Sequence, residues 1–110
     1  MENITIHIKP LSVNECWQGR RFKTPEYKKY ERDLLLLLPK LDVPKSVDLK
    51  IEIQFGLSNI VADFDNPVKP FVDILQKRYG FNDRYIQEAT IKKFKTFKGM
   101  EWIRFKIDPL

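Results

Sequence analysis

The stretch Val-Asp-Leu-Lys-Ile-Glu-Ile-Gln-Phe, residues 47–55, alternates apolar and polar side chains without a break. Successive side chains of a strand point to opposite faces, so this pattern is typical of a strand with one buried face. It is the cleanest strand pattern in the chain. Because one face is apolar, we expect other elements to pack over it.

Working outward, the same alternation predicts strands at residues 4–9 and 102–107. A less regular strand is predicted from 85 to 94, where Lys92-Lys93 interrupts the alternation. Residues 96–99, Thr-Phe-Lys-Gly, are predicted to form the hairpin turn that joins this strand to the last one.

Two segments between these strands predict helices. The first begins at Thr24-Pro25-Glu26, which supplies a cap, a proline and an early acid in the favoured order, and it ends before Pro39. The second runs from about Pro67 to Tyr79, with Asn66 as its N-cap and Gly80 after its end.

The resulting order is strand, helix, strand, helix, strand, strand. It predicts an α+β fold, a small mixed sheet with two helices packed on it. The 110 residues are expected to form one domain, 1–110, whose core is small enough that a homodimer would help to bury it. Within the run Leu34–Leu38, some leucines are expected to meet a second subunit; the alternative is that they pack under the next loop.

Charge and composition limit the classes of function that this chain can have. The chain has 20 Lys and Arg against 15 Asp and Glu, a net charge of +5, which favours an anionic partner such as nucleic acid. His7 is the only histidine and Cys16 the only cysteine, which excludes a His-based metal site and an internal disulfide. With no signal peptide and no long apolar run, we expect a cytoplasmic protein without membrane partners.

Acidic residues gather around the start of the second helix. Asp63 and Asp65 would leave an extended chain on the same face, where two carboxylates repel unless a cation lies between them. Mg²⁺ or Mn²⁺ prefers such oxygen ligands. Lys69 and Asp73 follow at helical spacing, and Asp83 comes after the next turn. A metal site that meets a phosphate is therefore one interpretation.

A plainer interpretation remains open for each of these residues. An Asp-x-Asp pair is common in solvated turns. Lys69 and Asp73 at i, i+4 are also what a simple surface ion pair requires. Asp83 would serve equally well as a turn or capping residue.

Basic and aromatic residues gather in two other segments. Residues 10–24 are predicted to form a loop in which Trp17 lies beside a basic cluster, as on nucleic-acid surfaces; the alternative is that Trp17 covers the core. Around the predicted hairpin tip stand Lys92, Lys93, Lys95 and Lys98.

Together these residues resemble the signature of the RusA-type Holliday junction resolvases. The resemblance lies in Asp63, Asp65, Asn66, Lys69, Asp73 and Leu75, followed by Gly80-Phe81-Asn82-Asp83, and in Lys9-Pro10-Leu11-Ser12-Val13-Asn14 near the start. It extends over nearly the whole chain. Two departures are visible: Asn82 stands where an acid is frequent, and residues 59–62 lack an arginine run.

The resemblance implies a homodimeric, metal-dependent endonuclease that resolves four-way DNA junctions by paired nicks. It would be nucleoid-associated and of cellular, phage or prophage origin. Asp63, Asp65, Asp83 and Asp73 would bind Mg²⁺ or Mn²⁺, and the catalytic set would be Asp63, Asp65, Lys69 and Asp83. DNA contacts would come from Asn14, Trp17, Arg20, Arg21, Lys23, Asn66, Lys92, Lys93, Lys95 and Lys98. Two alternatives stay open: a nucleic-acid-binding protein without catalysis, and a dimeric interaction module whose acids are structural caps.

Overall fold

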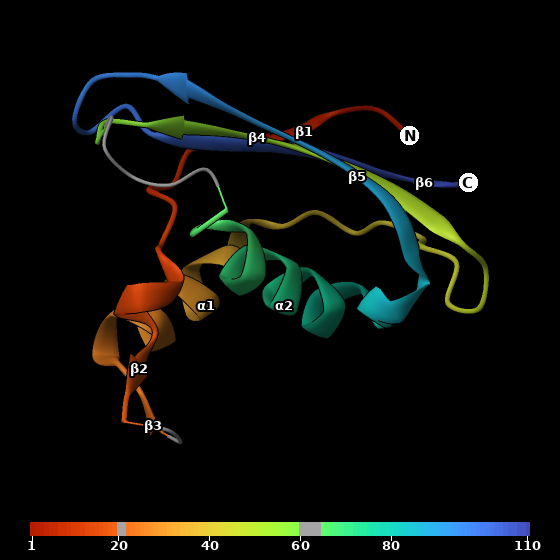
Figure 1. Ribbon diagram of the computed structural model, residues 1–110, viewed down its shortest axis with the longest axis horizontal. Coiled ribbons are helices and arrows are strands. Elements are labelled where there is room, and N and C mark those ends of the chain that lie inside the picture. Colours follow the sequence, from red (N-terminus) through yellow and green to blue (C-terminus); the bar gives the residue numbers. More distant parts are fainter. Residues whose placement is uncertain (20–21, 60–64) are drawn as a thin grey trace.

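A four-stranded sheet forms one layer of the molecule and two helices form the other (Figure 1). The computed structural model describes residues 1–19, 22–59 and 65–110. The strand order in the sheet is β1-β6-β4-β5. β5 runs parallel to β4, whereas β6 is antiparallel to both β4 and β1. The strands are β1 (Ile4–Ile6), β4 (Leu49–Leu57), β5 (Ile86–Lys95) and β6 (Trp102–Pro109).

β4 is formed by the alternating stretch predicted at residues 47–55, and it pairs with a strand on each side. Its apolar residues Leu49, Ile51, Ile53 and Phe55 are all buried, whereas the residues between them are only partly covered. Ile53 lies opposite Ile91 of β5. On its other side Ile53 lies opposite Phe105 of β6. The predicted strand is therefore confirmed, with bounds shifted by two residues at each end.

The predicted hairpin between the last two strands is wrong. β5 and β6 do not pair; each lies on a different side of β4. The 96–101 segment must therefore cross over the end of β4, and the backbone N–H of Thr96 donates to the carbonyl of Leu57 there. Local spacing cannot reveal this, because a short connection fits a hairpin equally well. The predicted basic hairpin tip is consequently absent.

Both helices pack on the same face of the sheet (Figure 1). α1 (Pro25–Leu37) begins as predicted, with the Thr24 side chain accepting a hydrogen bond from the Tyr27 backbone N–H. α2 (Val68–Tyr79) carries Phe71, whose ring meets Phe55 of β4 and Phe105 of β6 edge to face, at centroid distances of 6.1 and 5.5 Å. These three rings lie at the centre of the core.

The start of α2 differs from the prediction. Pro67, not Asn66, occupies the N-cap, and no side chain caps the helix. Residues 65–67 form a turn in which the Val68 N–H donates to the Asp65 carbonyl, while the Asn66 carbonyl accepts from Val13. That contact with a distant segment fixes Asn66 outside the helix. The end of the helix is as predicted, with Gly80 at φ 76°.

The predicted loop at residues 10–24 contains more structure than expected. It holds a 3-10 helix, η1 (Val13–Glu15), and two short antiparallel strands, β2 (Trp17–Gln18) and β3 (Phe22–Lys23). A second 3-10 helix, η2 (Asp83–Tyr85), precedes β5. Residues 20 and 21 lie between β2 and β3, outside the described ranges.

The predicted α+β class, with a mixed sheet and two helices, is confirmed. In the leucine run, Leu34 and Leu38 are buried, whereas Leu36 and Leu37 are exposed. In the described part of the chain no helix is long and apolar enough to cross a membrane.

Candidate acidic site beside the second helix

Lys69 of α2 connects two of the predicted acidic residues. Its Nζ lies 2.9 Å from Asp73 Oδ1, one turn further along α2, and 3.5 Å from Asp83 Oδ2 of η2. The helix spacing alone predicts the contact with Asp73. The contact with Asp83 depends on the chain returning beside α2 after Gly80, so three predicted site residues meet at one point.

Gln76, one turn beyond Asp73 on α2, holds Asp83 in this position. Its side-chain carbonyl accepts a hydrogen bond of 2.9 Å from the Asp83 backbone N–H, and its Nε2 donates to Asp73 Oδ1 at 3.4 Å. Asn82, where an acid is frequent in the family resembled, caps η2 by accepting from the Arg84 N–H at 3.0 Å. Sequence reasoning missed Gln76; its i, i+3 spacing from Asp73 was the available signal.

A groove of about 410 Å³ runs between α2 and the sheet, and Asp65, Lys69 and Asp83 all line it. We call it the acidic groove. Its remaining lining is apolar and comes from β4, α2 and β5: Ile51, Ile53, Val68, Val72, Ile86, Ala89 and Ile91. An apolar floor beside charged groups keeps water away from part of the groove and strengthens electrostatic interactions there.

The charges in the acidic groove are coupled. The hydrogen bond to Asp73 raises the pKa of Lys69, and the nearby charge of Asp83 adds to that effect. Lys69 is still 62% exposed, so solvent screens these interactions. The ammonium group therefore remains charged at neutral pH and neutralises part of the acidic cluster while staying accessible from solvent.

The donor set suits a hard cation, because the predicted ligands offer carboxylate oxygens. Asp65 and Asp83 line the same groove, and Asp73 reaches it through Lys69. Within residues 1–19, 22–59 and 65–110 no three His, Cys, Asp or Glu side chains are gathered closely enough to hold a metal. Asp63, the fourth predicted ligand, lies outside the described residues.

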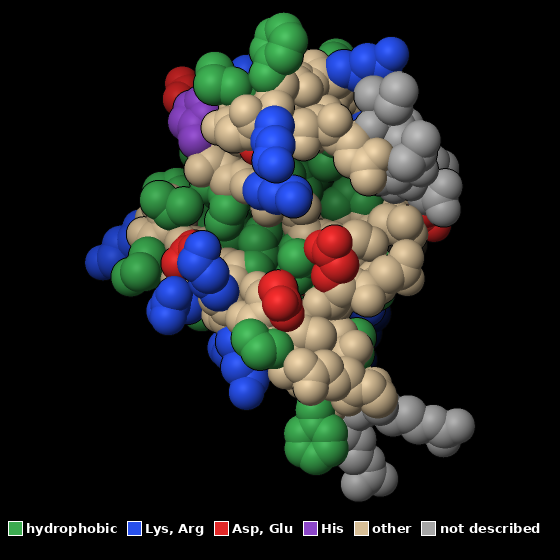
Figure 2. All heavy atoms as spheres, turned by 90° about the vertical axis from the view of Figure 1, so that its left-hand side faces the viewer, with side chains coloured by type: hydrophobic (Ala, Val, Ile, Leu, Met, Phe, Trp, Pro, Cys, Tyr) green, Lys and Arg blue, Asp and Glu red, His purple; other side chains and the backbone are tan. Residues whose placement is uncertain are grey.

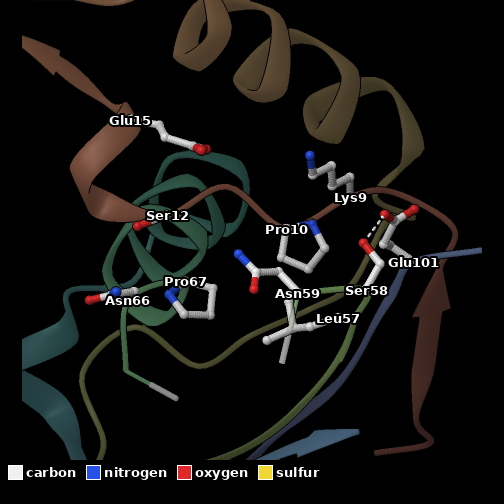
Figure 3. Close-up of a pocket in the computed structure, with 10 residues that line it drawn as sticks. All are labelled: Lys9, Pro10, Ser12, Glu15, Leu57, Ser58, Asn59, Asn66, Pro67 and Glu101. Atoms are coloured by element: carbon white, nitrogen blue, oxygen red, sulfur yellow. Dashed lines mark hydrogen bonds between the residues drawn. The ribbon is translucent and has the colours of Figure 1, made fainter. Parts of the chain in front are cut away.

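A second, smaller hollow of about 130 Å³ lies where β4 ends and α2 begins (Figure 3). On one side Glu101, buried before β6, accepts hydrogen bonds from Ser58 Oγ at 2.7 Å and from the Gly99 N–H at 2.9 Å. The Ser58 hydrogen bond lowers the pKa of Glu101. Glu101 thus ties the end of β4 to the crossover segment. Sequence reasoning missed it, since nothing local marks an isolated Glu as buried.

Asn66, one of the predicted DNA contacts, lines this same hollow together with Asn59, Ser12 and Lys9 (Figure 3). Its backbone is held by Val13 of η1. The start of α2 is therefore anchored to the N-terminal segment that carries the other predicted contacts.

The predicted contacts of the 10–24 segment lie on η1 and the β2–β3 ribbon. Asn14 is exposed, and Trp17 is 44% exposed while its ring meets Tyr27 edge to face at 5.9 Å. Trp17 therefore packs partly against α1, and its role in binding nucleic acid stays a prediction. Lys23 turns back to α1, with Nζ 3.1 Å from Glu31 Oε2. The predicted contacts Arg20 and Arg21 lie outside the described residues.

The remaining predicted contacts lie elsewhere than expected. Lys92, Lys93 and Lys95 belong to the exposed edge strand β5, and Lys98 lies in the 96–101 crossover. The four lysines therefore follow an edge of the sheet and the crossover beyond it, and do not form a hairpin tip.

Figure 2 shows the end of the molecule opposite the chain termini, where hydrophobic side chains floor a hollow with cationic and acidic side chains around it. A hollow of about 390 Å³ between α1 and the segment that follows β1 is lined by Lys9 and Lys29 but also by three acids, Glu15, Glu26 and Asp33. Charges of both signs give no net attraction for a phosphate, so this hollow is a poor anion site.

No protein-family model matches this chain, and no curated protein matches it either.

Proposed function

We propose that this chain is a metal-dependent DNA endonuclease of the RusA type, which resolves four-way junctions as a homodimer by paired nicks. The observation that supports this best is the meeting of Lys69 with Asp73 and Asp83 beside a groove that Asp65 also lines. Surface ion pairs are common, but here one acid of α2 and one of η2 share a single lysine beside a groove that a third acid, Asp65, also lines. Carboxylates close to a cation at a groove suit metal-assisted phosphodiester hydrolysis.

In this proposal Asp65, Asp73 and Asp83, together with Asp63, would hold Mg²⁺ or Mn²⁺. A bound ion would supply a Lewis acid that polarises the scissile phosphate and lowers the pKa of the attacking water. Lys69 leaves its carboxylate partners to contact a phosphate oxygen, where its charge stabilises the developing negative charge. Gln76 keeps Asp83 at the groove throughout, through its hydrogen bond to the Asp83 backbone.

Substrate binding needs help from other surfaces, because carboxylates repel DNA. The basic residues of the β2–β3 ribbon and of β5 would contact the backbone away from the scissile bond. Two active sites are needed to nick two strands of one junction. The exposed Leu36 and Leu37, at 80% and 53%, offer apolar surface of the kind that a second subunit covers. The protein would act on chromosomal or phage DNA in the cytoplasm.

The decisive experiment compares Asp65→Asn with Asp42→Asn, a matched change in the exposed connector between α1 and β4. With a synthetic four-way junction and Mg²⁺, Asp65→Asn should reduce cutting more than about a hundredfold yet retain binding, whereas Asp42→Asn should change neither cutting nor binding. Unchanged cutting by Asp65→Asn would remove the proposal.

One observation favours a second candidate, a junction-binding protein without catalysis. Lys69 already pairs with Asp73 and Asp83, and a lysine between two carboxylates removes the need for a metal ion. A titration with Mg²⁺ separates the two candidates: both predict salt-sensitive DNA binding, but only the nuclease predicts cutting that rises with Mg²⁺.

A further inference from the structure

We call the sheet face opposite the helices the open face, because no helix of the described residues lies over it (Figure 1). Even-numbered residues of β4, of β6 and of β5 from Glu88 onward point to it, because the odd-numbered residues beside them, such as Ile53, Ile91 and Phe105, point toward the helices. Its side chains are mostly polar, as expected for a solvated face. One end of it departs from that expectation.

At that end, two aromatic rings lie in one row across three strands. Phe94 of β5 and Trp102 of β6 both lie opposite Gly56 of β4. Their ring centroids are 5.7 Å apart and their planes differ by only 31°. Phe94 is 45% exposed. Two adjacent aromatic rings on an otherwise polar sheet face form an apolar patch, and such a patch is the kind of surface feature that binding sites use.

Gly56 makes the arrangement possible. A Cβ at this position would collide with the indole of Trp102, so the indole lies directly over the glycine backbone. Gly56 is in a regular strand with no positive φ, so no turn or bend requires a glycine there. A glycine inside a strand weakens it and often marks a close approach. Here the approach is that of Trp102, which brings its ring beside Phe94.

The next row of the open face is cationic. Lys92 of β5 and Arg104 of β6 lie on either side of Gln54. The Arg104 guanidinium lies 5.5 Å from the centroid of the Trp102 ring, and its Nε donates to Thr5. Neither row contains an acidic residue. The acids of the open face lie further along the strands, where Glu52, for example, pairs with Lys106 at 3.1 Å.

We propose that this end of the open face binds unpaired nucleotides of single-stranded nucleic acid. Phe94 and Trp102 would stack on the bases, while Lys92 and Arg104 would contact the phosphates. Flat rings next to cations form the standard combination for single strands, because every base has a face that stacks and every linkage carries a charge. This binding needs neither the acidic groove nor a metal ion, so it can be tested independently of DNA cleavage.

The test measures binding of the whole chain, in EDTA, to a labelled twelve-nucleotide oligo(dT) and to an abasic oligonucleotide with the same number of phosphates. Stacking predicts roughly tenfold or tighter binding of oligo(dT). Equal binding of the two would overturn the proposal, because phosphate contacts alone would then explain the affinity. Duplex of the same length binding as tightly as oligo(dT) would overturn it as well.

Variants locate the effect. Phe94→Ala should weaken oligo(dT) binding roughly tenfold, whereas Phe97→Ala, which removes an 82% exposed ring from the crossover, should leave it within about twofold. Equal affinities of Phe94→Ala and the unchanged chain would overturn the proposal. So would loss of self-association in Phe94→Ala, since the face would then belong to a contact between two copies.

A fluorescence measurement keeps the test valid if Phe94→Ala fails to fold. In Trp17→Phe, the only remaining tryptophan is Trp102, so its emission reports on the open face alone. Saturating oligo(dT) should quench that emission, and the abasic oligonucleotide should not. Unchanged emission at saturation would overturn the proposal.

Discussion

The two faces of the sheet use aromatic residues in opposite ways. On the covered face, Phe55, Phe71 and Phe105 are fully buried and meet edge to face. On the open face, Phe94 is 45% exposed and lies beside the partly buried Trp102, next to cations. Burial makes the first set a source of stability, while exposure leaves the second set available to a partner. The charged groups differ likewise: acids gather at the groove on the covered side, and cations flank the open aromatic row.

The largest difference is expected in stability. Phe71→Ala should lower the free energy of unfolding by about 3–5 kcal/mol, because it leaves a cavity between two other rings. Phe94→Ala, which truncates a ring that is 45% exposed, should cost less than about 1 kcal/mol. Urea unfolding followed by circular dichroism measures both. Similar losses would mean that the open aromatic row is a second core.

A pair of lysine substitutions tests whether the two faces differ in chemistry. Lys69→Met should reduce junction cutting about a hundredfold, or about 2.7 kcal/mol of transition-state stabilisation, because the groove loses its cation. Lys106→Met breaks a similar ion pair with Glu52 on the open face and should change cutting less than about twofold. The measurement is the initial rate at which each variant cuts a four-way junction in the presence of Mg²⁺. Equal rates for the two variants would make the Lys69 pairs purely structural.

The role of Gly56 can be tested next. Gly56→Ala forces the Trp102 indole off the strand, so we expect a loss of about 1–2 kcal/mol in stability and a changed near-ultraviolet circular dichroism signal. Gln54→Ala, in the neighbouring row of β4, is the control and should leave that signal unchanged. An unaltered signal in Gly56→Ala would separate the glycine from the position of the indole.

The smallest effect concerns acid stability. Hydrogen bonding lowers the folded-state pKa of Glu101, so this residue contributes stability that is complete above its unfolded pKa and is lost as the pH falls through the folded value. Between pH 6 and pH 3, Glu101→Gln should therefore lose less stability than the unchanged chain, by on the order of 1 kcal/mol. Glu88→Gln, an exposed change on β5, should follow the unchanged chain. Thermal melts across this range provide the measurement.

Much of the fold could be predicted from short stretches of the sequence. The alternation at 47–55 predicts β4, the Thr24-Pro25 start predicts α1, and Gly80 predicts the end of α2, because each rests on contacts within a few residues. In the candidate site, the pairing of Lys69 with Asp73 follows from helix geometry alone. The predicted hairpin is wrong because β5 and β6 could either pair with each other or lie on the two sides of β4. Which of these forms depends on strands that are distant in the sequence.

The sequence by itself determined the α+β class, the central strand and the pairing of Lys69 with Asp73, since periodicity, helix spacing and caps act over short distances. Only the tertiary structure decided that Asp83 returns to Lys69 through Gln76, and that Phe94 and Trp102 meet over Gly56. Those contacts join segments far apart in the chain. Which segments meet is set by the order of strands and by packing over the whole core, and no local pattern records it.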